Sequence, residues 1–409
     1  MVPIARNRRR SFSLSLTTLG VAGGIVAGAS TPVWAGWSTP VQPPAACLAP
    51  SGSGLVPNLA LNGNGLWALV TEQLMVGVIV CTSSDGVNWT GPTVIGQGVA
   101  PAVSVAPNGK IVVVWQGGTG TSPDEEAAYK LPGGSWTAPV VLDSSPAGHP
   151  LVSMDGSGNA IAVWAPNSGF AKTASLPATG SWSATTTLGA SYGLGLATNS
   201  SGQAIVGVRN GHDGPILAFS GTILGGLGAG LNLAGTYGTA IHPIHIAMNA
   251  AGAAAMDWES DGGSVIALRG TGGTWGTPVA WEVGNHHGIG TAIDNTGNVI
   301  VAFGQYTGLG NPVPVYGALH PAGGSWGPAT LLSSLSDLGN PYVAGDSAGT
   351  FVVAWKNSSS TITALTIPPG GGLTGTTAVV SPGTVYQLTM IPGLGVMFTT
   401  SGVAKESVN

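Results

Sequence analysis

The chain repeats one phrase, two short apolar stretches joined by a glycine turn, about every 47 residues. One copy begins at Pro101 and reads PAVSVAPNGKIVVVW, and another begins at Pro150 and reads PLVSMDGSGNAIAVW. Short runs rich in Val and Ile on either side of a glycine turn are typical of a β-hairpin. The repeat therefore predicts a chain made of many copies of one small antiparallel unit.

The turn glycine fixes the number of units. A third apolar stretch follows each hairpin, and five units continue with a tryptophan phrase such as Gly134-Ser-Trp136, which marks a fourth strand. We predict an all-β, eight-bladed β-propeller of four-stranded antiparallel sheets. A seven-bladed ring is the alternative if the last, incomplete unit is not a blade. The turn glycines are Gly65, Gly109, Gly158, Gly202, Gly252, Gly297, Gly349 and Gly393.

The missing strand of the eighth unit stands at the other end of the chain. Residues 384–409 supply a hairpin and a third strand but no fourth. The segment Gly36-Trp37-Ser-Thr-Pro40-Val41 copies the phrase that runs from Gly134 to Val140. We expect residues 36–41 to form the outer strand of the last blade, which would close the ring without an unpaired sheet edge. Residues 36–409 would then be a single propeller domain.

Residues 1–35 have the pattern of a signal peptide. Four arginines lie between residues 6 and 10, an apolar stretch runs from Leu14 to Gly28, and Val33-Trp34-Ala35 is a small-residue cleavage signal. The start Arg9-Arg10-Ser11-Phe12 resembles the twin-arginine export motif, and the general secretory route stays open as the alternative. No later stretch is predicted to span a membrane, so we expect a secreted, extracytoplasmic protein.

The charge and the cysteine content indicate which partners and which crosslinks to expect. Four of the chain's 11 Lys and Arg residues fall in the predicted leader, whereas all 16 Asp and Glu residues lie beyond it. Without a basic patch, nucleic acid is not an expected partner. Cys47 and Cys81 are the two cysteines, and in an exported protein such a pair predicts one disulfide. Two buried free thiols are the alternative.

One segment carries a family resemblance. Ser83-Ser84-Asp85-Gly86-Val87-Asn88-Trp89 resembles the Asp-box of sialidase-like (BNR-type) propellers, and the other units keep only its glycine and tryptophan. The whole chain after the leader resembles secreted bacterial propellers with such degenerate repeats. The resemblance implies an Asp–Gly turn between third and fourth strands. It does not extend to sialidase activity, because that family uses three arginines on the substrate carboxylate and only Arg209 and Arg269 follow the leader.

Histidines gather on one predicted face of the ring. In an up-and-down blade the second-to-third and fourth-to-first connections share a face, and six of the seven histidines fall in or beside such connections. Imidazoles that converge from neighbouring blades can bind a ligand or a metal. The alternative is that each is a separately solvated loop side chain. The candidate ligand-binding residues are His149, His242, His245, His286, His287 and His212.

Two acidic segments fall on the same predicted face as the histidines. Asp257-Trp-Glu259-Ser-Asp261-Gly262 resembles the start of a calcium loop, but Leu268 stands where the closing glutamate is expected. Asp257, Glu259 and Asp261 are therefore weak candidates for a divalent metal, with a solvated acidic turn as the alternative. The run Asp124-Glu125-Glu126 has no partner motif and is interpreted as a solvated loop.

No nucleophile elbow, phosphate loop or dinucleotide motif appears, so we assign no catalytic residue. The leading functional prediction is a secreted, monomeric propeller that binds a glycan or surface polymer across the histidine face. One alternative is a polysaccharide-acting or metal-dependent lyase or hydrolase that uses the same face. A structural cell-envelope protein is the other. Fold alone does not decide among them, because propellers carry many unrelated functions.

Overall fold

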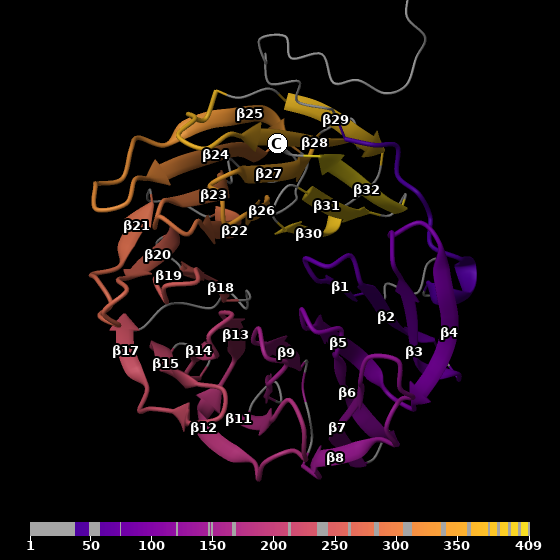
Figure 1. The fold of residues 1–409 in the computed structure, drawn as a ribbon. Coiled ribbons are helices and arrows are strands. Elements are labelled where there is room, and N and C mark those ends of the chain that lie inside the picture. The colour runs from indigo at the N-terminus through magenta and orange to yellow at the C-terminus, as the bar shows by residue number, and fades with distance from the viewer. Residues whose placement is uncertain are drawn as a thin grey trace, which may run out of the picture. The chain divides into compact units, whose positions relative to one another are not determined.

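The computed structural model of this chain is a ring of eight antiparallel sheets (Figure 1). The described residues all belong to one compact unit, Ala35–Asn409. They are residues 37–48, 58–73, 75–119, 122–145, 148, 150–165, 169–211, 214–234, 244–260, 263–281, 286–305, 313–336, 341–357, 361–374, 377–382, 385–391, 394–399 and 402–407. Among them, no helix is both long and apolar enough to cross a membrane.

Each sheet is one blade, and strand order within it follows the chain. Blades 1 to 4 consist of β1 (Asn58–Leu61), β2 (Trp67–Gln73), β3 (Gly77–Ser83) and β4 (Trp89–Gly96); β5 (Val99–Val105), β6 (Ile111–Thr119), β7 (Ser122–Lys130) and β8 (Val140–Asp143); β9 (Leu151–Met154), β10 (Ala160–Trp164), β11 (Gly169–Leu176) and β12 (Thr186–Ser191); β13 (Gly193–Thr198), β14 (Gln203–Arg209), β15 (Ile216–Thr222), β16 (Gly226–Leu227) and β17 (Leu231–Ala234).

Blades 5 to 8 continue in the same way. They consist of β18 (His245–Met248), β19 (Ala254–Ser260), β20 (Gly263–Arg269) and β21 (Val279–Trp281); β22 (His286–Ile293), β23 (Val299–Gln305), β24 (Val313–His320) and β25 (Thr330–Ser336); β26 (Tyr342–Gly345), β27 (Phe351–Lys356), β28 (Thr361–Ile367) and β29 (Thr377–Pro382); β30 (Val385–Ile391), β31 (Leu394–Thr399) and β32 (Gly402–Ser407). A short 3-10 helix, η1 (Ala45–Cys47), precedes β1.

The N-terminal segment closes the eighth blade, as predicted. Val41 and Val403 of β32 exchange two backbone hydrogen bonds of 2.9 Å, and Ser38 N–H donates to the Lys405 carbonyl at 2.7 Å. Trp37 packs against the buried cluster shared by blades 7 and 8, which includes Met397. The segment therefore serves as the fourth strand of a sheet whose other strands come from the far end of the chain.

The predicted hairpin turns are present in blades 1 to 7. Their glycines have φ between 83° and 98°, which L-residues with a side chain rarely adopt, so glycine is required at this point of the turn. The eighth, Gly393, lies outside the described residues. The residue three positions earlier is usually Asn or Asp, whose side-chain oxygen accepts the amide hydrogens two and four residues on, as in Asp155 with Ser157 and Asn159.

These turns also tie neighbouring blades together. Asn62 Nδ2 donates to the Ala106 carbonyl of blade 2 at 2.8 Å, and Asn249 Nδ2 donates to the Asp294 carbonyl of blade 6 at 2.9 Å. At the ring closure, Gln387 of blade 8 binds both backbone groups of Leu59 in blade 1. Main-chain groups near the ring centre are thereby satisfied across blade boundaries.

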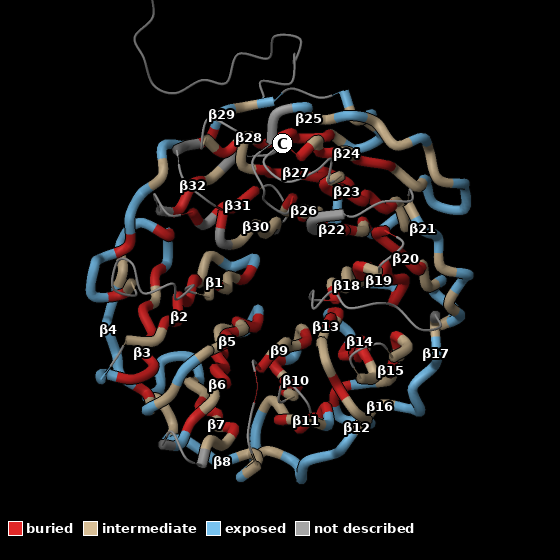
Figure 2. The backbone as a smooth tube through the Cα atoms, turned by 180° about the vertical axis from the view of Figure 1, so that it is seen from behind, coloured by how far each residue is buried: buried red, intermediate tan, exposed pale blue. Residues whose placement is uncertain are grey.

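Burial is greatest in the second strands, and the innermost strands are mostly half-buried. The second strands are nearly all buried, whereas the outermost strands are largely exposed, and Figure 2 shows this as a red interior within a pale blue rim. Trp115, Trp164, Trp258 and Trp355 stand at or near the ends of second strands and are at most 2% exposed, so their large flat rings fill the space between blades.

The tryptophan phrase precedes the outer strand in four blades rather than beginning it. Trp89 begins β4, but Trp136 and Trp275 form only isolated bridges. The outer strands of blades 2, 3, 5 and 6 begin four residues after the tryptophan, at Val140, Thr186, Val279 and Thr330. In blade 4, which lacks the tryptophan, two short strands, β16 and β17, pair with β15.

Candidate functional site

The up-and-down topology gives the ring two different faces. The turns that join first to second and third to fourth strands lie on one side, which we name the turn face. The second-to-third and blade-to-blade connections lie on the other, the loop face. His245 is the first residue of β18, an inner strand beside the ring centre (Figure 1), so it belongs to the loop face.

His245 is held by a carboxylate from the neighbouring strand of its own blade. Its Nδ1 lies 3.0 Å from Oδ1 of Asp257 in β19. The Asp257 side chain is fully buried, while that of His245 is 43% exposed. The contact follows from strand register, because His245 and Asp257 are directly paired in the β18–β19 ladder. The result is an imidazole fixed at one nitrogen and open to solvent on the rest of its ring.

Asp257 breaks the pattern of its repeat. It lies five residues after its turn glycine, a position that is Val70, Val114 and Val163 in blades 1 to 3 and alanine in blades 6 and 7. All of those residues are buried and apolar. A buried carboxylate costs free energy unless it is paired or protonated, so this blade departs from the repeat's apolar core where it meets the imidazole.

The pair faces the boundary between blades 5 and 6. Ala255, two residues before Asp257 and on the same side of β19, packs with Ile289 and Phe303 of blade 6. Trp258, on the opposite side, packs against blade 4. Glu259 shares the Asp257 side, is 7% exposed, and interacts electrostatically with His245. One imidazole and two carboxylates therefore occupy a single side of blade 5.

Burial and the partner's charge shift the pKa of each member of this pair in opposite directions. Burial favours neutral His245, but the charge of Asp257 and its hydrogen bond outweigh that effect and raise the pKa of His245 above 6.5. Burial also raises the pKa of Asp257 above 3.8, although His245 opposes the shift. Both directions favour retention of a proton by the pair, and a protonated imidazole can donate a hydrogen bond from its exposed edge.

The remaining predicted site residues fall into two groups. His149, His212, His242 and Asp261 lie outside the described residues. His286 and His287 are the first residues of β22, the inner strand next to β18 in the ring, where their backbone pairs with Gln305 and Gly304. His245 and the start of β22 therefore both lie at the loop face, on adjacent blades.

The acidic segments differ from their predictions. Asp257 and Glu259 lie within β19 rather than in a solvated turn, because their apolar neighbours Met256 and Trp258 continue the strand. Within the described ranges, no three His, Cys, Asp or Glu side chains are grouped in a way that could hold a metal ion.

The run at Asp124 is likewise part of a strand, β7, and not a solvated loop. Glu125 is 0% exposed, and neither of its carboxylate oxygens has a hydrogen-bond partner. Burial, reinforced by Asp143 and the adjacent acidic residues, raises the pKa of Glu125 to about 10. Alternation along the strand explains the difference, since Asp124 and Glu126 lie on one side of the sheet and Glu125 enters the interior on the other.

Asp143, close to Glu125, has the opposite character. Burial would raise its pKa, but hydrogen bonds from Lys172 (2.6 Å), Ser145 and Trp164 outweigh burial and hold the pKa at about 2. Two carboxyl groups of blade 2 thus differ in ionisation because only one of them has partners. Sequence reasoning missed this arrangement, because the Lys172 and Trp164 partners come from blade 3.

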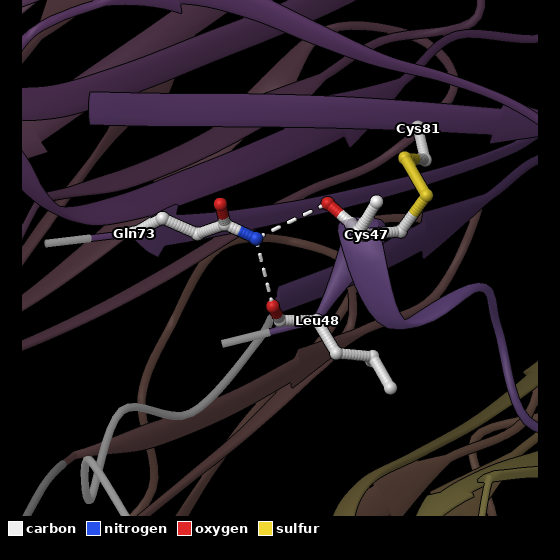
Figure 3. Close-up of a disulfide and its surroundings, with 5 residues drawn as sticks. Cys47, Leu48, Gln73 and Cys81 are labelled. Atoms are coloured by element: carbon white, nitrogen blue, oxygen red, sulfur yellow. Dashed lines mark hydrogen bonds between the residues drawn. A yellow bond between two sulfur atoms is a disulfide. The ribbon is translucent and has the colours of Figure 1, made fainter. Parts of the chain in front are cut away.

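The predicted disulfide is present between Cys47 and Cys81, with a Cα–Cα distance of 5.9 Å (Figure 3). Gln73 Nε2 donates to the carbonyl oxygens of Ala46 and Leu48, which fastens η1 to blade 1. In the nearby turn between β3 and β4, Asp85 Oδ1 accepts the amide hydrogens of Val87 and Asn88. Those bonds lower the pKa of Asp85.

Comparison with known proteins gives similarity of fold. No family description matches the chain. No curated protein matches its sequence. Among solved structures, the BP39L lectin from Burkholderia pseudomallei aligns with a TM-score of 0.54 and 13% identity, over 80% of this chain and 99% of the lectin.

Two polysaccharide lyases are also similar in fold. A PL25 ulvan lyase, bound to -[GlcA(1-4)Rha3S]-, aligns with a TM-score of 0.51 and 10% identity, over 91% of this chain and 94% of the lyase. The lyase Uly1 aligns with a TM-score of 0.50 and 9% identity, over 78% of this chain and 91% of that one. At these identities the comparisons establish the β-propeller architecture.

Proposed function

We propose that this protein binds a glycan on its loop face, at the boundary of blades 5 and 6. The observation that carries the proposal is the His245–Asp257 pair. A half-exposed imidazole is fastened to a fully buried carboxylate, at a second-strand position that is apolar in blades 1 to 3, 6 and 7. A fixed, directional donor of this kind suits the hydroxyl and carboxylate groups of a saccharide. The fold similarity to a lectin supports the proposal by analogy.

The test is a glycan array with the wild-type protein, followed by titration of each hit by calorimetry. We expect saturable binding, and a loss of about tenfold or more in affinity for His245→Ala, since a hydrogen bond to a charged group contributes roughly 1.5–3 kcal/mol. Asn58→Ala is the matched control, because Asn58 occupies the same register position in blade 1. Unchanged binding by His245→Ala, or no binding to any glycan, would contradict the proposal.

A second candidate, a polysaccharide lyase, is favoured by the same pair, because an imidazole oriented by a carboxylate can accept a proton. His245 would take the proton from C5 of a uronic acid residue. The C–H electron pair would form the C4=C5 bond, and the bond from C4 to the leaving oxygen would break, with water protonating that oxygen. Release of unsaturated uronate, followed by ultraviolet absorbance, would be lost in His245→Ala. No absorbance change on any uronate polymer would exclude this reaction.

We also propose that residues 1–35 are an export signal and that the Ser83–Trp89 segment is a single Asp-box. The Cys47–Cys81 disulfide supports export, because such bonds persist in oxidising compartments. The Asp85 turn lies between third and fourth strands, where the resemblance requires it. The intact mass of protein recovered outside the cytoplasm should correspond to a chain that begins at Gly36. A full-length mass from that fraction would refute cleavage.

A further inference from the structure

A pocket with a volume of about 290 Å³ opens between blades 6 and 7 on the turn face, opposite the proposed glycan site. Leu319 and Phe351 make its apolar wall, and the rings of Pro321 and Pro368 border it. Polar contributions come from His320, whose ring stands edge-on to Trp326 at 5.0 Å between centroids. The volume is close to the lower end of small-ligand sites.

The equivalent space between blades 2 and 3 is filled by the chain itself. Lys110 is 1% exposed, and its ammonium group donates to the carbonyl oxygens of Gly158 (3.0 Å), Pro177 (2.8 Å) and Ala178 (3.2 Å). The same ammonium lies 5.1 Å from the centre of the Tyr129 ring. This boundary therefore contains a complete ammonium site made of three carbonyl groups and an aromatic ring.

The two boundaries correspond residue by residue. Lys110 and Asn298 each follow the turn glycine of their hairpin. Tyr129 pairs with Val112 in blade 2, as Leu319 pairs with Ile300 in blade 6. On the facing blade, Ala160 pairs with Leu176 before Pro177, as Phe351 pairs with Ile367 before Pro368. The counterparts of Lys110, Tyr129, Gly158, Pro177 and Gly180 are thus Asn298, Leu319, Gly349, Pro368 and Gly371, all of which line the pocket.

Two side-chain differences open the pocket. Asn298 does not cross to blade 7, because its Nδ2 donates to Asp294 Oδ2 at 2.7 Å and its Oδ1 accepts from the Ala322 amide at 2.9 Å. Leu319 lacks the aromatic ring that Tyr129 supplies. The pocket is therefore the space that the Lys110 chain and the Tyr129 ring fill at the other boundary, less the volume that Phe351 adds where Ala160 stands. The Gly349 and Pro368 carbonyls correspond to two of the three acceptors of Lys110, and the Pro368 oxygen also accepts the Gly371 amide hydrogen at 2.8 Å.

Two buried acidic side chains near the Gly349 turn also favour a cation, although neither lines the pocket. Asp294 is buried, and its Oδ2 lies against Gly349, where an added Cβ would approach it to 3.0 Å. Asp346 is buried in blade 7 at the position of Asp155, whose charge favours protonated Lys110 in the filled site. Burial lowers the pKa of Lys110 to about 8 despite Asp155, so the ammonium remains mostly charged at neutral pH.

We propose that the pocket between blades 6 and 7 binds an amino sugar with a free amino group. The ammonium takes the place of the Lys110 ammonium against the Gly349 and Pro368 carbonyls, and the ring fills the volume left by Tyr129 against Leu319 and Phe351. This site is separate from the loop face, so the proposal holds or fails independently of His245.

The test compares D-glucosamine with D-glucose by ligand-observed NMR and calorimetry at neutral pH. The two sugars share a ring and differ in the ammonium group. We expect saturable binding of glucosamine, with glucose about tenfold or more weaker. Asn298→Lys should abolish glucosamine binding, because the new side chain can fill the pocket as Lys110 does.

Asn159→Lys is the matched control. Asn159 makes the same pair of contacts in blade 3, from Nδ2 to Asp155 Oδ2 (2.6 Å) and from the Ala178 amide to Oδ1 (2.8 Å), so this variant loses equivalent bonds without entering the pocket. It should bind glucosamine like the wild type. If Asn298→Lys does not fold, Leu319→Tyr fills the pocket from the other side and should abolish binding. Equal affinity for both sugars, no binding, or binding that survives a filling variant overturns the proposal.

Discussion

Glu125 gives the sharpest prediction about stability. In the folded protein it is fully buried without a hydrogen-bond partner, and its pKa is raised from 4.5 to about 10. The unfolded chain releases this proton above pH 4.5, whereas the folded protein retains it until about pH 10. The stabilising effect of the neutral acid is therefore complete at low pH and falls by about 1.4 kcal/mol per pH unit between those values.

The substitution Glu125→Gln removes this titration and nearly preserves shape. Relative to the variant, the wild type should lose about 4 kcal/mol of unfolding free energy between pH 5 and pH 8. Urea denaturation of both proteins at pH 5, 6, 7 and 8 measures the difference, and other titrating groups cancel because they are common to both. Asp124→Asn, which alters the adjacent carboxylate, should retain the wild-type slope. Parallel profiles for wild type and Glu125→Gln would show that Glu125 is ionised in the folded protein and would refute the reasoning.

Three further predictions follow from other contacts. Replacing Cys47 and Cys81 together with serine opens a crosslink with a sequence separation of 34 and should reduce the unfolding free energy by about 4 kcal/mol in urea titrations; a change below about 1 kcal/mol would argue against chain entropy as the cause. Val41→Pro removes the amide that bonds Val403 and should lower the midpoint of thermal unfolding, whereas Val41→Ala keeps the bond; equal midpoints would contradict closure by this segment. Asp257→Asn should lower the pKa of His245 measured by NMR. In the wild type, protonated His245 stabilises the fold fully below pH 6.5, and this contribution is lost as the pH rises through the raised pKa of the folded protein. In the variant the contribution should be lost at a lower pH. An unaltered titration curve would remove Asp257 as the cause.

The propeller architecture was predictable because a short sequence pattern that determines a hairpin locally repeats at a regular interval along the chain. A turn glycine between two apolar runs encodes a hairpin without help from distant residues, and eight copies encode a ring. The closing strand was predictable for the same reason, since the phrase around Trp37 repeats that around Trp136 and the last unit, residues 384–409, has no fourth strand of its own.

The side-chain chemistry was less predictable because it depends on which strands face each other. The pairing of His245 with Asp257 follows from hairpin register, and counting seven residues before and five after Gly252 would have found it. The burial of Glu125 could not be found in this way, because a run of three acidic residues predicts solvent exposure until the strand assignment divides it between two sides. Lys110 gave no signal at all, since its carbonyl partners lie in the next blade.

The central claim is that a glycan contacts the imidazole that Asp257 holds at the boundary of blades 5 and 6. Its most direct test is an NMR titration of protein labelled at the histidine Cε1, with the His245 resonance assigned from the His245→Asn variant and a glycan identified on the array as the ligand. With a glycan that has no free amino group, the predicted result is saturable movement of the His245 resonance while that of His320 on the turn face stays in place. Tight binding that leaves the His245 resonance in place would contradict it.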